Sequence, residues 1–182
     1  MYRFARTAFT DAVKKQQEKH GSRRQYQRME QAADVADTLG EFEKEFLESR
    51  DHFYMASTGE TGWPYVQHRG GPAGFVKVLD DRTIAFADFA GNKQYISVGN
   101  LTKDNRVALL FMDYARQARL KILARVDVVE DDAALLAKLA LPGYKAKVER
   151  AMVARIEAFD WNCPQHITPR FTAQEIAENR VK

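Results

Sequence analysis

The sequence predicts a mainly β protein with flanking helices (the α+β class), built around a small barrel. Three observations support this fold class. Apolar and polar residues alternate at strand spacing through the middle of the chain, Gly and Asp turn residues interrupt that alternation, and apolar residues recur at helical spacing on either side of it. The 182 residues are 45% hydrophobic and 29% charged, which suits one structural domain with a sizeable core.

The amino-terminal residues predict two or three short helices. Apolar residues between Phe4 and Val13 recur at helical spacing, and Gly21-Ser22 interrupts the helical pattern. Thr38-Leu39-Gly40-Glu41 has the pattern of a capping box and leads into a further helix. We therefore expect a helical arm over residues 1–40, followed by a barrel domain with carboxy-terminal helices over residues 41–182.

Six segments between residues 53 and 129 are predicted to be strands. The first two flank the turn Gly59-Glu60-Thr61-Gly62, and the next two flank Asp80-Asp81. The fifth is apolar on both faces, which is typical of a strand covered on each side. The segments are FYMAST (53–58), WPYVQHR (63–69), GFVKVL (74–79), TIAFAD (83–88), RVALLFM (106–112) and RLKILARVDVV (119–129).

The sixth predicted strand carries cations on one face. Side chains alternate along a strand, so Leu120 and Ile122 point one way while Arg119, Lys121 and Arg125 point the other. Such a row either binds an anion or forms a solvated face, and solvated charge is what most exposed strand faces carry.

The remaining segments predict mostly helix. GNKQYISVGN (91–100) fits a short helix or turn, and AALLAKLA fits a helix that stops at Pro142-Gly143. The apolar stripe from Tyr144 to Phe159 predicts a second helix, serving as core or as a dimer contact. DWNCPQHITPRF follows as an extended segment, and the capping box at residues 172–175 opens a last short helix.

Three donor-rich segments fall at strand ends or on a strand face. The first is Gln67-His68-Arg69-Gly70-Gly71-Pro72, and the second runs from Asp88 to Gln94 with Gly91, Asn92 and Lys93. The third is the strand that carries Arg119 and Lys121. Each could be an ordinary turn or solvated face, but together they could converge on a phosphate, which needs several donors to replace its water.

Composition excludes several other classes. No stretch is long and apolar enough to span a bilayer, and the amino terminus lacks a secretory h-region, so we expect a cytoplasmic protein without a membrane partner. The single Cys163 and four His leave no metal site to expect. Residues 1–31 carry eight Lys or Arg against three Asp or Glu, yet such arms are usually solvated helix faces, so nucleic acid is not the expected partner.

Segments PYVQHRGGPAGFVKVLDDRTIAFADFAGNKQYISVGNLTKDNRVALLFMD and RLKILARVDVV resemble the pyridoxamine 5'-phosphate oxidase-like family of FMN-binding split barrels. The resemblance covers roughly residues 42–130, and WNCPQH is similar to a segment of some members. It is closest to uncharacterised members with an RGGPxGF segment and a D-x-x-G-N-[KR] segment. The combination of motifs in this order is specific for the family, but not for a substrate.

The resemblance implies a six-stranded split β-barrel that forms a homodimer, with one FMN at each of two subunit interfaces. Asn92 and Lys93 correspond to the Arg-Lys pair that holds the FMN phosphate, and Gln67 corresponds to an Arg on the preceding strand. Phe86 and Ala87 correspond to the strand whose backbone passes the flavin. His68, Gly70 and Gln94 belong to the same expected cofactor-binding set.

Two of these positions depart from the family. Gln67 and Asn92 supply no charge, so we expect Arg69, Arg119 or Lys121 to make up the deficit. The family's Gln before the long strand aligns with Gln117 or with Arg119, and the second register keeps the strand alternation continuous.

The function that the resemblance implies is that of an FMN-dependent oxidoreductase acting on a small molecule. Arg69 with the Gly70 and Gly71 amides is the candidate to stabilise charge at the flavin N1–C2=O edge. The alternative is a flavin- or haem-binding carrier or sensor without turnover of its own. No counterpart of the vitamin B6 enzyme's substrate-phosphate residues is recognised, and the catalytic residues and the roles of Trp161, Cys163 and His166 stay unassigned.

Overall fold

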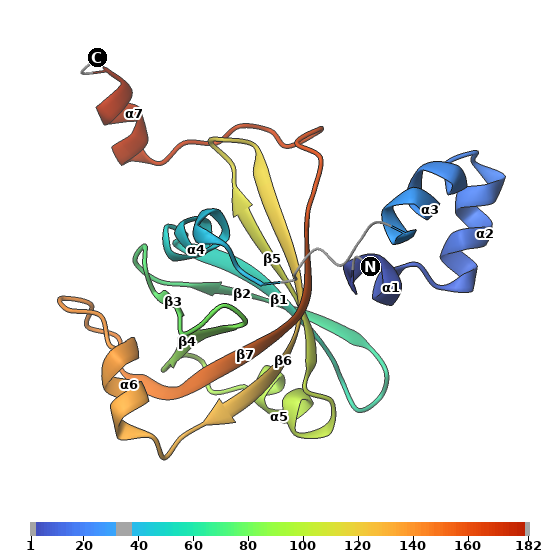
Figure 1. Cartoon of the computed structure of the whole chain (residues 1–182). Coiled ribbons are helices and arrows are strands. Elements are labelled where there is room, and N and C mark those ends of the chain that lie inside the picture. Colours follow the sequence, from blue (N-terminus) through green and yellow to red (C-terminus); the bar gives the residue numbers. More distant parts are fainter. Residues whose placement is uncertain (1–2, 32–37, 181–182) are drawn as a thin grey trace.

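The computed structural model describes residues 3–31 and 38–180. Its body is a single antiparallel sheet with strand order β2-β1-β5-β6-β7-β4-β3, curled into a half-barrel (Figure 1). The strands are β1 (His52–Thr58), β2 (Pro64–Gly70), β3 (Val76–Val78), β4 (Thr83–Phe89), β5 (Arg106–Asp113), β6 (Ala118–Val129) and β7 (Val148–Trp161).

Helices flank this sheet on several sides. Figure 1 shows α1 to α3 standing together beside the barrel, while α7 projects from it at a separate corner. The end of the predicted arm, residues 32–37, lies outside the described residues. The helices are α1 (Arg3–Ala8), α2 (Asp11–Lys19), α3 (Arg23–Gln31), α4 (Glu41–Glu48), α5 (Ile96–Lys103), α6 (Ala133–Leu139) and α7 (Ala173–Arg180).

The prediction of a helix from Tyr144 to Phe159 is wrong. Residues 148–161 form β7, which pairs with β4 on one side and β6 on the other, so the sheet has seven strands rather than six. The apolar residues Val148, Met152 and Ile156 are four apart, and a spacing of four fits one face of a strand as well as one face of a helix. The choice is made by pairing with β4 and β6, a non-local contact that periodicity does not contain.

The two capping boxes differ in outcome. The predicted N-cap at Thr38 is displaced by two residues, because α4 begins at Glu41 with Gly40 as N-cap and Glu43 accepting from the Gly40 N–H at 3.1 Å. The box at Thr172 is confirmed. Glu175 N–H donates to Thr172 Oγ1 at 3.2 Å, and Thr172 N–H donates to Glu175 Oε2 at 2.7 Å.

The core lies inside the curled sheet and beneath α4. The alternation predicted for β6 is confirmed, since Leu120 and Ile122 are fully buried among a cluster of phenylalanines. Trp161 fastens α4 to the end of β7, because its indole N–H donates to Glu43 at 2.9 Å and its ring packs against Phe46. Trp161 is therefore a packing residue within the chain.

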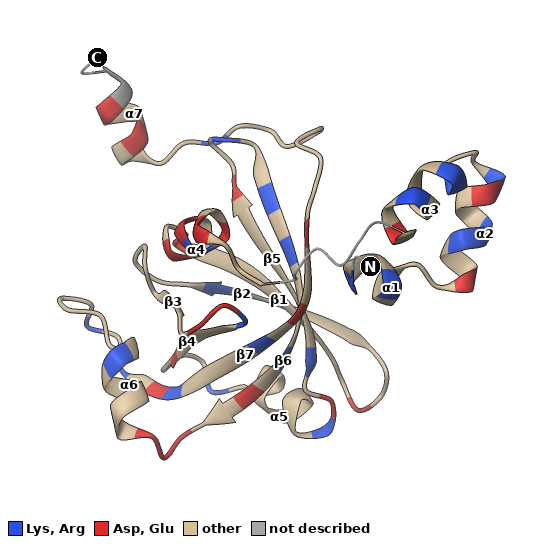
Figure 2. Ribbon diagram, in the orientation of Figure 1, with Lys and Arg blue, Asp and Glu red and all other residues tan. Residues whose placement is uncertain are grey.

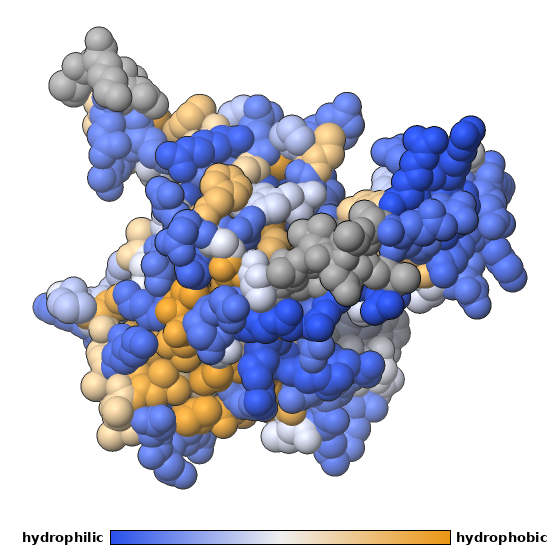
Figure 3. All heavy atoms as spheres, viewed as in Figure 1, coloured by the Kyte–Doolittle hydropathy of each residue, from blue (hydrophilic) through white to orange (hydrophobic). Residues whose placement is uncertain are grey.

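The two sides of the molecule differ in surface character. On the face shown in Figure 3, hydrophobic residues gather over the region of α6 and β7, whereas the arm is hydrophilic. Figure 2 shows acidic residues interspersed with the basic ones of the arm, and Glu30 pairs there with Arg23 and Lys14. Among the described helices, none combines the length and apolar character that crossing a bilayer requires.

Candidate functional site

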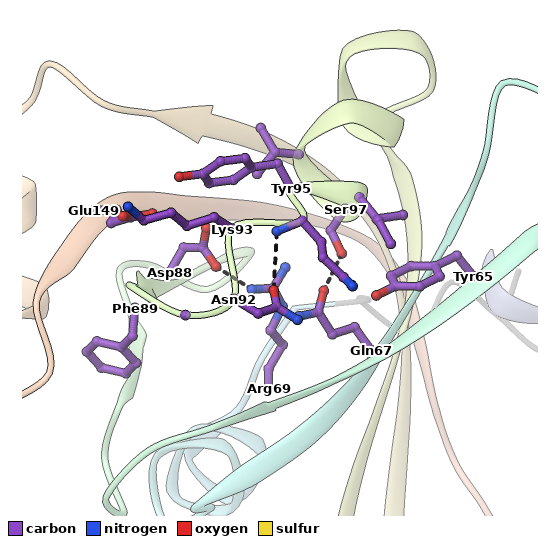
Figure 4. Close-up of a pocket in the computed structure, with 14 residues that line it drawn as sticks. Tyr65, Gln67, Arg69, Asp88, Phe89, Asn92, Lys93, Tyr95, Ser97 and Glu149 are labelled. Atoms are coloured by element: carbon purple, nitrogen blue, oxygen red, sulfur yellow. Dashed lines mark hydrogen bonds and ion pairs between the residues drawn. The ribbon is translucent and has the colours of Figure 1, made fainter.

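A polar pocket lies between the edge strand β2, the end of β4 and the first turn of α5 (Figure 4). Glu149 of β7 completes its wall. It gathers residues from segments up to 84 positions apart in the chain, which is the arrangement that a ligand site needs. The lining residues are Tyr65, Gln67, Arg69, Asp88, Phe89, Gly91, Asn92, Lys93, Gln94, Tyr95, Ile96, Ser97, Val98 and Glu149.

Strand alternation aims one face of β2 into the pocket. Tyr65, Gln67 and Arg69 occupy every second position, so all three side chains reach the same side. Gln67 Oε1 accepts a hydrogen bond from Ser97 Oγ at 2.8 Å. This bond joins β2 to the start of α5 and fixes one wall of the pocket.

The loop that enters α5 has an unusual backbone. Lys93 and Tyr95 both have positive φ, at 59° and 53°, a region that costs a non-glycine residue about 1 kcal/mol or more. Asn92 Oδ1 accepts from the Gln94 N–H at 3.2 Å and holds the turn. Such strain persists only where surrounding contacts enforce it, and it is typical of functional segments.

The first turn of α5 presents backbone donors to the pocket. Its N-cap Tyr95 is left-handed and makes no side-chain cap, so the N–H groups of Ile96, Ser97 and Val98 have no partner within the helix. A left-handed residue followed by helical ones forms a concave set of amides that favours anions. The helix dipole adds to this preference.

A buried chain of charges supports the pocket from below. Asp88 Oδ1 accepts from Arg69 Nη1, and Asp88 Oδ2 accepts from Arg150 Nη1 at 2.9 Å. All three side chains are about nine-tenths buried. Within the described part of the chain, Arg69 Nε is buried and has no hydrogen-bond partner. A buried N–H without an acceptor is uncommon in folded proteins, and Arg119 Nε shares this property outside the pocket.

The charges of the pocket are unequally engaged. Arg150 Nη2 donates to Glu149 at 3.2 Å, so both acidic lining residues, Asp88 and Glu149, are held by Arg150. Burial is the largest single influence on the pKa of Arg150 and lowers it, but Asp88, Tyr95, Glu149 and Glu130 together outweigh burial and raise that pKa above its ordinary value. Over residues 3–31 and 38–180, Lys93 forms no ion pair. Its ammonium is thus a charged donor without a carboxylate partner among the described residues, beside the first-turn amides of α5.

Five of the sequence-predicted site residues come together here. Gln67, Arg69, Asn92, Lys93 and Gln94 all line the polar pocket. The two donor-rich strand ends therefore do converge.

Four other predicted residues lie beside the pocket rather than in it. His68 and Gly70 line a neighbouring hollow, because the alternation that turns Gln67 and Arg69 into the polar pocket turns His68 away. Phe86 and Ala87 are buried in β4, with the backbone of that strand leading to Asp88.

Arg119 and Lys121 are not brought to the pocket within one chain. Arg119 Nη2 donates to the Cys163 carbonyl at 3.1 Å, and Lys121 pairs with Asp160 at 2.9 Å. In the sheet order, β6 is separated from β2 by two strands, so its outer face points elsewhere. The alternative register residue, Gln117, donates to the Ile167 carbonyl at 2.6 Å.

Sequence reasoning missed Glu149 and Arg150 altogether. Both belong to β7, which was predicted as a helix. In the strand, Arg150 lies opposite Asp88 of β4 and Glu149 lies at the adjoining register shift, a placement that a helix does not predict. Pro142-Gly143 followed by alternating Met152, Ala154 and Ile156 is the signal that could have suggested a strand.

The carboxy-terminal segment contributes no metal centre. Cys163 is exposed, and His166 has a positive φ of 64° in the turn that packs toward β6. In the part of the chain that the structure describes, no three His, Cys, Asp or Glu side chains are grouped to hold a metal ion.

The family model described as "Pyridoxamine 5'-phosphate oxidase" matches residues 39–161, which include the whole polar pocket. The chain belongs to this family. Its seven-stranded half-barrel accordingly has the split-barrel fold of pyridoxamine 5'-phosphate oxidase-like proteins. Comparison with curated protein sequences found no significant match.

Three solved structures illustrate the fold. A putative pyridoxamine 5'-phosphate oxidase from Lactobacillus delbrueckii is 21% identical with a TM-score of 0.54, over 70% of this chain and 97% of its own. HupZ from Group A Streptococcus is 13% identical with a TM-score of 0.55, over 73% and 99%. An F420 reductase is 20% identical with a TM-score of 0.50, over 67% and 98%. At these identities the likeness establishes the fold.

Proposed function

We propose that this member of the pyridoxamine 5'-phosphate oxidase family is an FMN-dependent oxidoreductase with a small-molecule substrate. The observation that carries the proposal is the polar pocket, where Lys93, Arg69 Nε and the first-turn amides of α5 have no acceptor among the described residues. A phosphate monoester offers three acceptor oxygens and up to two negative charges. The residues present therefore fit the phosphate end of FMN.

The phosphate contacts follow from the donors around the pocket. Lys93 and the α5 amides bind the charged oxygens, while Asn92 and Gln94 add neutral donors at the rim. Gln67 is held by Ser97 and shapes the wall. We assign to Arg69, whose Nη1 pairs with Asp88, the role of the second cation that Gln67 and Asn92 do not supply.

The flavin ring is proposed to lie along the end of β2. A Cβ on Gly70 would come within 2.7 Å of the His68 ring, and one on Gly71 would come within 2.9 Å of Phe75, so neither position has room for a side chain. The glycines therefore make room for side chains of the chain itself, and the flavin ring would lie next to this packed segment. FMN supplies hydride-accepting chemistry when bound. The Gly71 N–H already donates to the Asp51 carbonyl at 2.9 Å, and Arg69 is assigned to the phosphate end, so neither is left for the N1–C2=O edge of the ring.

A homodimer is part of the proposal. Tyr54, Leu110 and Leu123 form a partly exposed outer face that continues across β1, β5 and β6. This face, which also carries Arg119 and Lys121, is the proposed contact with a second copy. Neighbouring Val66 is 60% exposed, as expected of an apolar side chain awaiting a partner surface. Arg119 and Lys121 approach a cofactor only through such a contact.

The test of the cofactor is the visible spectrum of freshly purified protein, followed by titration of flavin-free protein with FMN. The proposal expects absorbance typical of bound flavin and saturable binding. Colourless protein that stays unoccupied in excess FMN would contradict it.

A second function, a flavin- or haem-binding carrier or sensor, is favoured by one observation. Both carboxylates of the pocket, Asp88 and Glu149, are engaged by Arg150, so neither stands ready as a general base. Rapid reduction of the bound flavin by NADH or NADPH in stopped flow supports the oxidoreductase. Flavin that responds only to dithionite supports the carrier.

A further inference from the structure

Arg150 lies outside the polar pocket but contacts the groups that build it. It is 8% exposed in β7, and each of its guanidinium nitrogens donates to a different carboxylate. Nη1 bonds Asp88 at 2.9 Å, Nε bonds Glu130 at 3.1 Å and Nη2 bonds Glu149 at 3.2 Å. Three carboxylates exceed what one cation needs for charge balance, and they fix its position from three directions.

The first route from Arg150 to the pocket runs through Asp88. One carboxylate oxygen of Asp88 takes Arg150, and the other takes Arg69. Because both oxygens of the Asp88 carboxylate accept hydrogen bonds, the orientation of the carboxylate is fixed. It fixes the orientation of the Arg69 guanidinium in turn. Arg69 Nε, the buried donor without an acceptor in the described chain, is held where it is by this linkage.

The second route runs through Tyr95. The Arg150 guanidinium carbon lies 4.9 Å from the centre of the Tyr95 ring, a cation–π contact. Tyr95 is the left-handed N-cap of α5, whose conformation opens the first-turn amides to the pocket. Arg150 thus supports a strained residue that has no capping bond of its own.

From these two routes we infer that Arg150 is a positioning residue for the phosphate end of the flavin nucleotide, acting through Asp88 on Arg69 and through Tyr95 on the amides of α5. The inference rests on the proposed function, since it assigns the phosphate to the polar pocket. It adds a residue from a strand that contributes no donor to the ligand directly.

The test compares FMN with riboflavin, which has the same ring and lacks the phosphate. The dissociation constant of riboflavin divided by that of FMN measures the contribution of the phosphate end. A merely structural role of Arg150 would lower the melting temperature without changing this ratio. Flavin-free full-length protein is titrated with each flavin in the oligomeric state in which it is isolated. For Arg150→Met the ratio falls by about tenfold or more. The matched control is Arg155→Met, which removes an arginine from the same strand, 66% exposed and paired with Asp127; its ratio stays at the wild-type value.

Arg150→Lys keeps the charge and loses the three-way geometry. A positioning role predicts only partial rescue, with the ratio still about threefold below wild type. This variant also decides the matter if Arg150→Met does not fold. A wild-type ratio in folded Arg150→Met, or full rescue by Lys, overturns the inference and leaves the proposed function standing. Wild-type protein that binds neither flavin, or binds both equally, overturns the phosphate site and the inference with it.

Discussion

The polar pocket and the outer face of β6 both carry basic side chains on a strand, and each has a buried arginine Nε without a hydrogen-bond partner among the described residues, Arg69 in the pocket and Arg119 on β6. On β6, Lys121 and Arg125 each pair with one acidic neighbour on β7, and the Arg125–Glu157 pair is about half exposed. In the pocket, Arg69 is nine-tenths buried and still has a free Nε. An unmet donor therefore does not separate the two faces. They differ because Arg69 shares a pocket with Lys93 and the first turn of α5, whereas Lys121 and Arg125 of β6 pair with carboxylates of β7.

The largest expected effect comes from removing the buried cation. Arg69→Met leaves Asp88 with Arg150 alone, and we expect the free energy of unfolding of flavin-free protein to fall by about 2–3 kcal/mol, because a buried carboxylate loses a charged partner. FMN binding weakens as well. Urea denaturation measures the first effect and FMN titration the second. An Arg69→Met protein with wild-type stability and wild-type FMN affinity would remove Arg69 from both roles.

Lys93 of the pocket and Lys121 of β6 are expected to contribute differently to FMN affinity. Lys93→Ala weakens FMN binding by about 1–3 kcal/mol through loss of a phosphate contact, with riboflavin binding unchanged. Lys121→Ala on β6 removes an equivalent side chain from a surface pair with Asp160, so FMN affinity within one subunit changes by less than about twofold. Equilibrium titration of both variants checks the contrast. Equal losses would show that the comparison between the two faces is mistaken, or that the second copy brings Lys121 to the cofactor.

A smaller effect separates the charge of Lys93 from its backbone strain. Lys93 has a φ of 59°, which glycine adopts without cost, so Lys93→Gly is expected to be more stable than Lys93→Ala by about 1 kcal/mol. Both variants lose the same phosphate contact. Thermal unfolding of the flavin-free variants measures the difference, and a Gly variant no more stable than the Ala variant would argue against strain at this turn.

The smallest effect belongs to an exposed pair far from the pocket. Hydrogen bonds from Arg106 lower the pKa of Asp104 from 3.8 to about 2. A lowered folded-state pKa stabilises the fold above the unfolded value, so this contribution is present above pH 4 and disappears as the pH falls toward 2. Asp104→Asn removes it and slightly flattens the dependence of melting temperature on pH in that range. An unchanged profile would mean that solvent screens the pair completely.

Most of the barrel could be predicted from the sequence, because its first six strands follow from local residue patterns. Alternation in β6 and the turns at Gly59–Gly62 and Asp80-Asp81 depend on neighbouring residues, and the structure confirms all three. The strand β7 was missed because Val148, Met152 and Ile156 satisfy two periods at once, and pairing with β4 decides between them.

The residues of the candidate site also divide into those that the sequence predicts and those that only the structure reveals. Residues that sit in short motifs, such as Arg69 and Lys93, were identified from sequence because glycine and donor residues cluster there. Arg150 and Glu149 were not, since their relation to Asp88 exists only through the β4–β7 register. The sequence left open whether the cation row on β6 binds an anion or is a solvated face, because a strand face does not reveal which charges its neighbour will neutralise.

The most direct measurement is a crystal structure of the protein with FMN bound. We expect the phosphate in the polar pocket, with oxygens within hydrogen-bond distance of Lys93 Nζ, Arg69 Nε and the first-turn amides of α5. A nucleotide bound elsewhere, or a phosphate held by Arg119 and Lys121 while the polar pocket stays filled with water, would contradict it.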